Sequence, residues 1–178
     1  NNTDPFNLSL CNKNLEPAYN HRLSLNYTTF DPATFVNLFA FITATYTSNA
    51  IANAQSINQE TFVRVTRPVN VDNNKSINGN LHFGFPVKKL NSRFNVGPTV
   101  SYSESLSILQ GRENSIRKQT VGGTARYNYS LKEILTVDLS ANLSHQQTLY
   151  DFNSPDQVYF NKTYTAEMNL NCFKKYQL

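Results

Sequence analysis

The chain has 178 residues and a formal net charge of +4, and charged residues make up only 16% of it. That share lies well below the roughly 25% of soluble domains, and Asn, Ser and Thr fill the difference. No run of about 18 apolar residues occurs, which excludes a transmembrane helix and leaves a transmembrane β-barrel open.

Polar and apolar residues alternate with a period of two along most of the chain, which indicates β-strands with one wet and one dry face. The clearest case is the stretch SRFNVGPTVSYSESLSI, in which Phe94, Val96 and Val100 share one parity and Ser and Thr dominate the other. Seven strands are predicted, at residues 21–30, 34–47, 61–87, 92–108, 119–131, 133–145 and 158–172. Pro68 and the stretch VDNNKS predict a bulge or bend in the third strand.

The connections between the predicted strands are of two kinds. Short turn signals stand near residues 31, 90 and 132, and another begins near residue 174. Longer polar stretches predict hairpin tips at residues 48–60, 110–115 and 151–157. Outer-membrane barrels show this asymmetry, with short periplasmic turns at one end and long external loops at the other.

The predicted fold class is therefore all-β, an antiparallel meander of about seven long strands that forms part of a large transmembrane β-barrel. We expect a single barrel segment over residues 1–178, with an external loop at 1–20, strands and hairpins at 21–173 and the start of a periplasmic turn at 174–178. Bacterial single-chain barrels have an even number of strands, so seven predict an incomplete barrel. The opening NNTDPF shows no initiator methionine and no targeting signal, which also favours a piece of a larger protein.

The polar parity carries mainly Asn, Ser, Thr and Gly, which suits a confined aqueous lumen better than the highly charged outer face of a soluble sandwich. Arg126, Asp138 and Glu167 fall on this parity, where a lumen tolerates them and lipid would not. Aromatic residues stand close to the tight turns, where an interfacial girdle would lie: Phe83, Phe85, Tyr127 and Tyr129. Glu104 and Lys162 on the apolar parity argue against lipid, although both lie far enough along their strands to be in the part that projects beyond the bilayer. A soluble β-sandwich stays as an alternative.

No catalytic motif, nucleotide-binding loop or metal-ligand spacing is present, so we expect no enzyme, no cofactor and no metal site. His21, His82 and His145 are far apart and are interpreted as lumen or hairpin residues. Asp138 and His145 share a strand but lie on opposite faces, which excludes a dyad. Cys11 and Cys172 are interpreted as unpaired rather than as a disulfide. The basic residues form isolated pairs, so no nucleic acid is expected as a partner.

The segment DPFNLSLCNKNLEPAYNH resembles a recurrent stretch of TonB-dependent outer-membrane receptors, Gly-Asn-Pro-Asn-Leu-Lys-Pro-Glu, which precedes a barrel strand. Its Asn-Leu-x-Pro core is kept as Asn14, Leu15, Glu16 and Pro17, whereas Cys11 stands in place of the glycine and Lys13 in place of the proline. The stretches PVNVDNNKSINGNLHFGFPVKKL and GRENSIRKQTVGG are similar to the barrels of Bacteroidetes outer-membrane proteins of this receptor type.

The resemblance implies a parent barrel of about 22 strands with a plugged lumen, of which this chain forms roughly a third. It implies ligand binding and uptake across the outer membrane, with outer-membrane lipid, the remaining barrel, the plug, TonB and an unidentified transported ligand as partners. Two alternatives stay open. One is a non-transporting outer-membrane barrel that serves as an anchor or assembly platform, and the other is a soluble secreted β-sandwich that binds glycan or protein.

Overall fold

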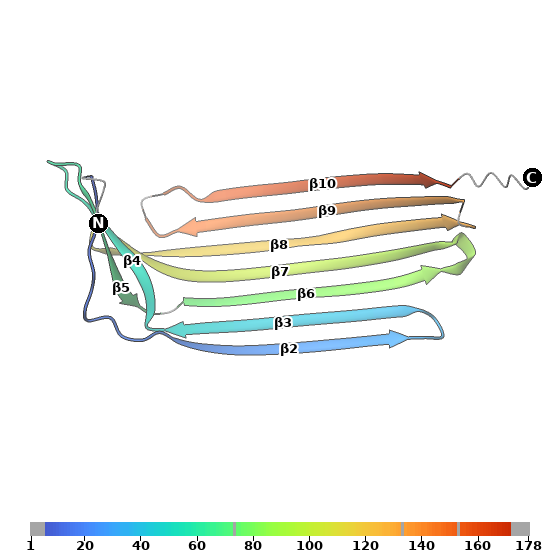
Figure 1. Cartoon of the computed structure of the whole chain (residues 1–178), viewed down its shortest axis with the longest axis horizontal. Helices are drawn as coiled ribbons and strands as arrows, with labels where there is room; N and C mark the ends of the chain where they lie inside the picture. Colours follow the sequence, from blue (N-terminus) through green and yellow to red (C-terminus); the bar gives the residue numbers. More distant parts are fainter. Residues whose placement is uncertain (1–5, 73, 133, 153, 172–178) are drawn as a thin grey trace, which may run out of the picture.

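The computed structural model describes residues 6–72, 74–132, 134–152 and 154–171. Seven long strands lie side by side in a single layer (Figure 1), and each pairs with its neighbour in antiparallel fashion. In spatial order they are β2 (Tyr19–Asp31), β3 (Val36–Ser48), β6 (Asn74–Val87), β7 (Ser92–Leu109), β8 (Arg112–Leu131), β9 (Leu135–Tyr150) and β10 (Gln157–Leu170). The predicted all-β antiparallel meander of about seven long strands is confirmed.

Three short strands stand at the opposite end from the tight turns and correct the prediction for residues 48–87. They are β1 (Asn7–Ser9), β4 (Ala50–Ile57) and β5 (Arg64–Val71). Residues 48–60 were expected to be a polar tip and residues 61–87 one return strand. Instead β4 and β5 form their own hairpin, β4 contacts the end of β7, and β1 pairs in parallel with β5. Ala50 and Val71 face each other across this hairpin and are buried, which explains why the two strands pair together.

Asparagine side chains hold the segment before β2 against β5. The Asn12 amide donates a hydrogen bond to the Pro68 carbonyl at 3.0 Å, and the Glu16 N–H donates to the Asn70 Oδ1 at 2.8 Å. The Asn70 amide also donates to the Asn49 carbonyl at 2.9 Å. The expected external loop at residues 1–20 therefore contains a short strand, and β2 begins at Tyr19; residues 1–5 lie outside the described residues.

The predicted tight turns near residues 31, 90 and 132 are all present at one end of the sheet (Figure 1), whereas residues 174–178 lie outside the described residues. In the first turn the Asp31 carboxylate accepts hydrogen bonds from the Thr34 hydroxyl at 2.5 Å and from the Ala33 N–H at 2.9 Å. These two donors hold the pKa of Asp31 below its ordinary value. A turn stabilised in this way fixes the register of the β2–β3 hairpin.

Across the described residues the sheet has no second layer above it, so its large apolar side chains lie on the surface. Ala50 and Val71 are its only buried apolar residues, whereas Leu23, Val121 and Tyr164 are 64%, 60% and 69% exposed. A β-sandwich needs a facing sheet to cover such residues, so the soluble-sandwich alternative is not supported. No helix in the described part of the chain is long and apolar enough to cross a membrane.

The hairpins are staggered along the strand direction. Phe30 lies one residue before the end of β2, whereas Gly84, in the same row, lies three residues before the end of β6. Ser92 begins β7, whereas Tyr129 opposite lies two residues before the end of β8. Each hairpin thus extends two residues beyond the one before it, a shift of one residue per strand. With a rise of about 3.3 Å per residue and a strand spacing of about 4.8 Å, this shift corresponds to a tilt of about 35°, within the range of membrane barrels.

β7 ends at Leu109 and β8 begins at Arg112, so the predicted tip at residues 110–115 is reduced to a two-residue turn. Gln110 and Gly111 both have positive φ, at 52° and 75°. Two successive residues of positive φ are typical of the type I′ turn, whose twist matches that of the flanking strands.

Substitution of Gly111 tests this turn. A Cβ at this position meets no atom within 4 Å, so only the backbone conformation opposes a side chain. We expect Gly111→Val to lower the free energy of unfolding of the full-length protein by about 1–2 kcal/mol and Gly111→Asn to leave it nearly unchanged, because Asn tolerates positive φ. Urea unfolding in detergent micelles measures both variants. Equal losses for Val and Asn would contradict the turn assignment.

Candidate functional site: a lipid-facing band and a lumen face

The register assigns every residue of the long strands to one of two faces. One face, here called the outer face, carries the apolar parity, with rows such as Leu25–Ile42, Ala44–Ile77 and Phe94–Tyr127. The other, here called the lumen face, carries rows such as Asn80–Thr99, Asn95–Arg126 and Asp138–Glu167. The sequence-based assignment of Arg126, Asp138 and Glu167 to the polar face agrees with this register.

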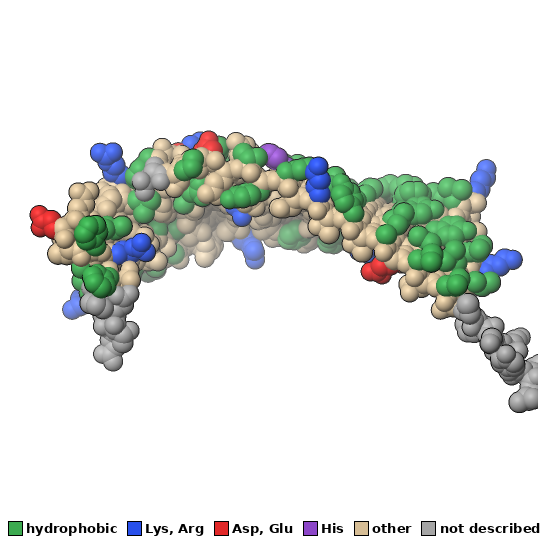
Figure 2. Space-filling model, turned by 90° about the horizontal axis from the view of Figure 1, so that it is seen from above, with side chains coloured by type: hydrophobic (Ala, Val, Ile, Leu, Met, Phe, Trp, Pro, Cys, Tyr) green, Lys and Arg blue, Asp and Glu red, His purple; other side chains and the backbone are tan. Residues whose placement is uncertain are grey.

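An uncharged band on the outer face begins at the tight turns. On β6 it runs from Phe85 to Ile77 before the first charge, Lys75, and on β7 it runs from Phe94 to Tyr102 before Glu104. The band is thus nine residues tall on both strands, which at the deduced tilt spans about 24 Å, close to the roughly 25 Å apolar belt of outer-membrane barrels. Figure 2 shows hydrophobic side chains gathered over the end of the sheet that carries the tight turns.

Aromatic rings form a continuous ladder at the turn end of the band. The centroids of Phe83 and Phe85 lie 5.3 Å apart, those of Phe85 and Phe94 5.6 Å, and those of Phe94 and Tyr127 4.9 Å. The Tyr127 hydroxyl shares a hydrogen bond of 2.9 Å with Ser92 at the turn, so its polar tip lies at the edge of the band. The predicted girdle residues Phe83, Phe85 and Tyr127 thus meet across strands, as expected at a membrane–water interface.

A second group of aromatic and charged residues borders the band at its far end, and sequence reasoning missed it. Tyr46 stacks on His21 with centroids 6.3 Å apart, and the Lys162 Nζ lies 4.6 Å from the centre of the Phe160 ring. The Lys75 ammonium lies 2.9 Å from the Glu104 carboxylate. Glu104, which argued against lipid, therefore stands at this border, and the Lys162 ammonium reaches it by lying over the Phe160 ring. The signal in the sequence was the position of these residues on the apolar parity, eight to twelve residues from the turn ends of their strands.

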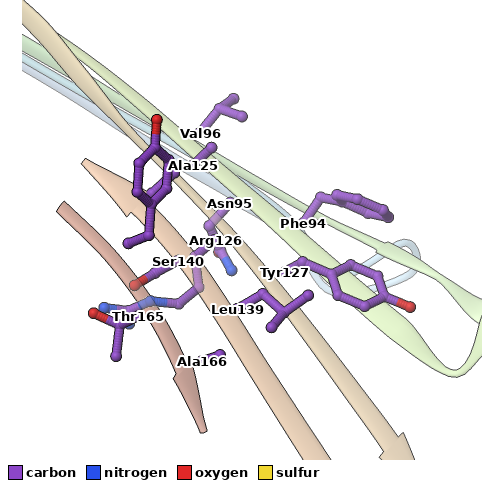
Figure 3. A pocket seen from close by; sticks show the side chains of 12 residues that line it. Phe94, Asn95, Val96, Ala125, Arg126, Tyr127, Leu139, Ser140, Thr165 and Ala166 are labelled. Atoms are coloured by element: carbon purple, nitrogen blue, oxygen red, sulfur yellow. The ribbon is translucent and has the colours of Figure 1, made fainter. Parts of the chain in front are cut away.

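The outer face is hollowed where small side chains face one another. One hollow of about 470 Å³ lies beside the aromatic ladder. Its walls include the rings of Phe94, Tyr127 and Tyr164 and the side chain of Leu139. Phe94, Tyr127 and Leu139 come from three neighbouring strands and lie close together there (Figure 3). Its floor is formed by alanines, including Ala125 and Ala141. Shallow apolar hollows of this kind suit acyl chains.

A chain of polar side chains crosses the lumen face near the turn end. The Arg93 guanidinium donates to Asn37 at 3.0 Å and to Asn95 at 3.4 Å, and the Asn95 amide donates to Asn128 at 3.2 Å. The Asn128 amide donates in turn to the Asp138 carboxylate. Gly84 makes room for this chain, because a Cβ there would collide with Asn37 and would lie 2.7 Å from the Asn95 Oδ1.

Arg126, Asp138 and Glu167 lie together at the end of this chain of hydrogen bonds, where Asp138 is its last acceptor. With Ser140 and Thr165 they line one hollow of about 570 Å³. A neighbouring hollow of about 520 Å³ adds His82, Asn95 and Asn142 to the rim. Asp138 and Glu167 stand directly opposite each other on β9 and β10, and Arg126 stands opposite Ser140. The three charges predicted for the lumen therefore form one cluster, separate from the other cations of this face, Arg93 and Lys118.

The three histidines do not come together. His82 is on the lumen face, one of the two places expected, whereas His21 and His145 are on the outer face at the far end of the band, so the lumen half of the lumen-or-hairpin interpretation is wrong for these two. Asp138 and His145 lie on opposite faces, as predicted. Among the described residues no three His, Cys, Asp or Glu side chains gather as metal ligands do. Cys11 is exposed before β2, and Cys172 lies outside the described residues, so their interpretation stays a prediction.

A one-layer antiparallel sheet of tilted strands, with an apolar band on one face and a hydrated polar face on the other, defines the wall of a membrane β-barrel. The Outer membrane protein beta-barrel family matches residues 1–177, and the chain belongs to that family. It is therefore a protein of the cell outer membrane of a Gram-negative bacterium. Neither the curated proteins nor the solved structures include a match to the chain.

The lipid-facing band is tested by a pair of arginine substitutions on adjacent residues. Leu81 lies in the middle of the band on the outer face, and Asn80 lies on the lumen face. We expect Leu81→Arg to lower the free energy of unfolding of the full-length protein in lipid bilayers by about 2–4 kcal/mol, and Asn80→Arg to have little effect. Equilibrium urea unfolding in vesicles provides the measurement. If Asn80→Arg were the more damaging change, the two faces would be inverted.

The lumen-face chain is tested at Gly84. We expect Gly84→Ala to lower the free energy of unfolding by about 1–2 kcal/mol, because the new methyl group displaces Asn37 and Arg93 from their hydrogen bonds. In an Asn37→Ala background the same change is expected to cost less, since the nearest colliding atom is gone. A double-mutant cycle by urea unfolding measures this coupling, and a coupling of zero would show that Gly84 has no such role.

Proposed function

We propose that this chain is a wall segment of a TonB-dependent receptor-type barrel, which binds a ligand at its external end and passes it through the lumen. The observation that carries the proposal is the lumen face. From β6 to β10 it carries mainly Asn, Ser and Thr side chains, with the cations Arg93 and Lys118 and with one cluster of charges of both signs, Arg126, Asp138 and Glu167, that lines two hollows. Such a face presents many hydrogen-bonding groups to a molecule in the lumen. The resemblance of residues 4–21 to receptor sequences points the same way.

The pairing of the edge strands supports a larger barrel. In the described residues β2 pairs only with β3, and β10 only with β9. Both edge strands run towards the tight-turn end, so direct pairing between them would be parallel, unlike every other pair of long strands. Two copies side by side in one membrane would meet in the same parallel way. We therefore infer that an odd number of further strands completes the wall between β10 and β2, which fits an even total.

A non-transporting barrel that serves as an anchor or assembly platform is the second candidate. The observation that favours it is the small external sheet of β1, β4 and β5, which presents exposed apolar side chains at Phe6, Ile51 and Phe62. Such a surface suits a fixed protein partner. For either candidate we propose no catalytic or cofactor chemistry and no nucleic-acid partner.

Cysteine labelling in intact cells separates the two candidates. In the full-length protein with Cys11 and Cys172 replaced by serine, Ser140→Cys places a thiol on the lumen face and Leu139→Cys places one on the outer face. If uptake is driven through TonB, a membrane-impermeant maleimide is expected to label Ser140→Cys in energised cells and to label it more slowly after a protonophore, since plug displacement then stops.

Leu139→Cys is the matched control, because lipid shields it in both conditions. Labelling of Ser140→Cys at the same rate with and without the protonophore would reject energy-driven uptake and favour the platform. Rapid labelling of Leu139→Cys would instead show that the two faces have been assigned wrongly.

A further inference from the structure

A cross-strand row of polar residues crosses the far border of the outer face. The register places His21 opposite Tyr46, Tyr46 opposite Lys75, Lys75 opposite Glu104 and Glu104 opposite Arg117. These five side chains come from five neighbouring strands and share the apolar parity. His21 and Tyr46 stand where the uncharged band ends, and the row rises from there by about one residue per strand to Arg117, within the level of lipid headgroups in the outer leaflet.

The charges in this row are only partly satisfied by one another. The Glu104 carboxylate accepts a hydrogen bond from the Tyr102 hydroxyl at 2.8 Å as well as the Lys75 ion pair. Arg117 is held 2.6 Å from Asp151. The Lys75 side chain is 50% exposed, and its ammonium carries three donors, of which the Glu104 Oε2 takes one. Lys75 therefore presents free donors to the outside, beside the imidazole–phenol stack of His21 and Tyr46.

An apolar hollow lies directly below Lys75, towards the tight turns. It has a volume of about 540 Å³, and its floor is formed by Leu23, Ala44 and Ile77. His21, Tyr46, Lys75 and Tyr102 form its rim. The site thus combines a cationic and hydrogen-bonding rim with an apolar floor on the membrane side. That order matches an amphipathic molecule whose charged group lies at the interface and whose chain lies in the bilayer.

We propose that this rim and hollow form a binding site for an anionic lipid of the outer leaflet, in which Lys75 and His21 contact the headgroup phosphate and an acyl chain occupies the hollow. Glu104 limits the affinity of the site, because it draws one donor of Lys75 away and repels phosphate. The proposal rests on the outer-membrane placement of the chain and is independent of whether the barrel transports.

The same arrangement recurs on the other half of the sheet. A hollow lined by Val121, Gly123 and Leu143 has His145 and Phe160 at its far rim. His145 stands opposite Phe160, and the Lys162 ammonium lies over the Phe160 ring. A histidine, an aromatic ring and a lysine above an apolar hollow therefore occur twice at the same border. This repetition supports recognition of headgroups along the whole outer edge of the band.

Lipid titration of the full-length protein tests the proposal. The protein in dodecylmaltoside is titrated with phosphatidylglycerol and with phosphatidylcholine, and native mass spectrometry measures the fraction carrying each lipid. We expect preference for phosphatidylglycerol, and we expect Lys75→Gln to weaken its binding about fivefold. Lys118→Gln is the matched control, because Lys118 lies at a similar height on the lumen face, opposite Ser103 and Thr148, and its loss is expected to leave lipid binding unchanged.

Glu104→Gln provides a test of opposite sign, which a loss of fold could not imitate. It is expected to strengthen phosphatidylglycerol binding, since it removes a competing anion from Lys75. Equal binding of the two lipids, or equal affinity of Lys75→Gln and the unsubstituted protein, would overturn the proposal. Inorganic phosphate at 100-fold excess over lipid is expected not to displace it; displacement would assign the rim to free phosphate and reject the lipid.

Discussion

Backbone hydrogen bonding is the constraint on which the rest of this structure depends. A strand in lipid has no water to satisfy its N–H and C=O groups, so each must pair within the sheet. The long ladders from β2 to β10 supply that pairing. Their register determines whether each side chain of these strands faces lipid or the lumen. A slip of one residue would place Arg126 and Asp138 in lipid and Leu139 in the lumen. The only interruption in the β6–β7 ladder covers Gly97 and Pro98, and Pro98 has no N–H to donate.

The stagger of the hairpins explains residues that seemed to contradict a lipid-facing band. A row perpendicular to the strands does not run parallel to the membrane, because it rises by one residue per strand from β2 to β10. Lys162 stands opposite Leu143 in the row of Pro98, but it is eight residues from the end of β10, whereas Pro98 is six residues from the start of β7. From there its ammonium reaches the far border by lying over the Phe160 ring. Glu104 lies twelve residues beyond the first residue of β7, Ser92, and is beyond the band altogether.

The sequence predicts those features of the fold that depend only on the alternation of polar and apolar residues along a single strand. Alternation located all seven long strands and three tight turns, and it assigned Arg126 and Asp138 to the polar face. It could not predict the β4–β5 hairpin, because Ala50, Val71 and the Asn12–Pro68 hydrogen bond depend on contacts between distant segments. The Lys75–Glu104 pair was hidden for the same reason. Parity shows that two residues share a face, but only the register shows that they are opposite.

The charged side chains of the two faces are held in different ways. On the outer face the Lys75 ammonium lies 2.9 Å from the Glu104 carboxylate, and the Arg117 guanidinium lies 2.6 Å from the Asp151 carboxylate. On the lumen face Asp138 accepts a hydrogen bond from the neutral amide of Asn128. A neutral donor fixes the position of a carboxylate without cancelling its charge. The lumen cluster thus keeps a field that can act on a molecule inside the barrel, whereas on the outer face Glu104 and Asp151 each offset part of the charge of a neighbouring cation.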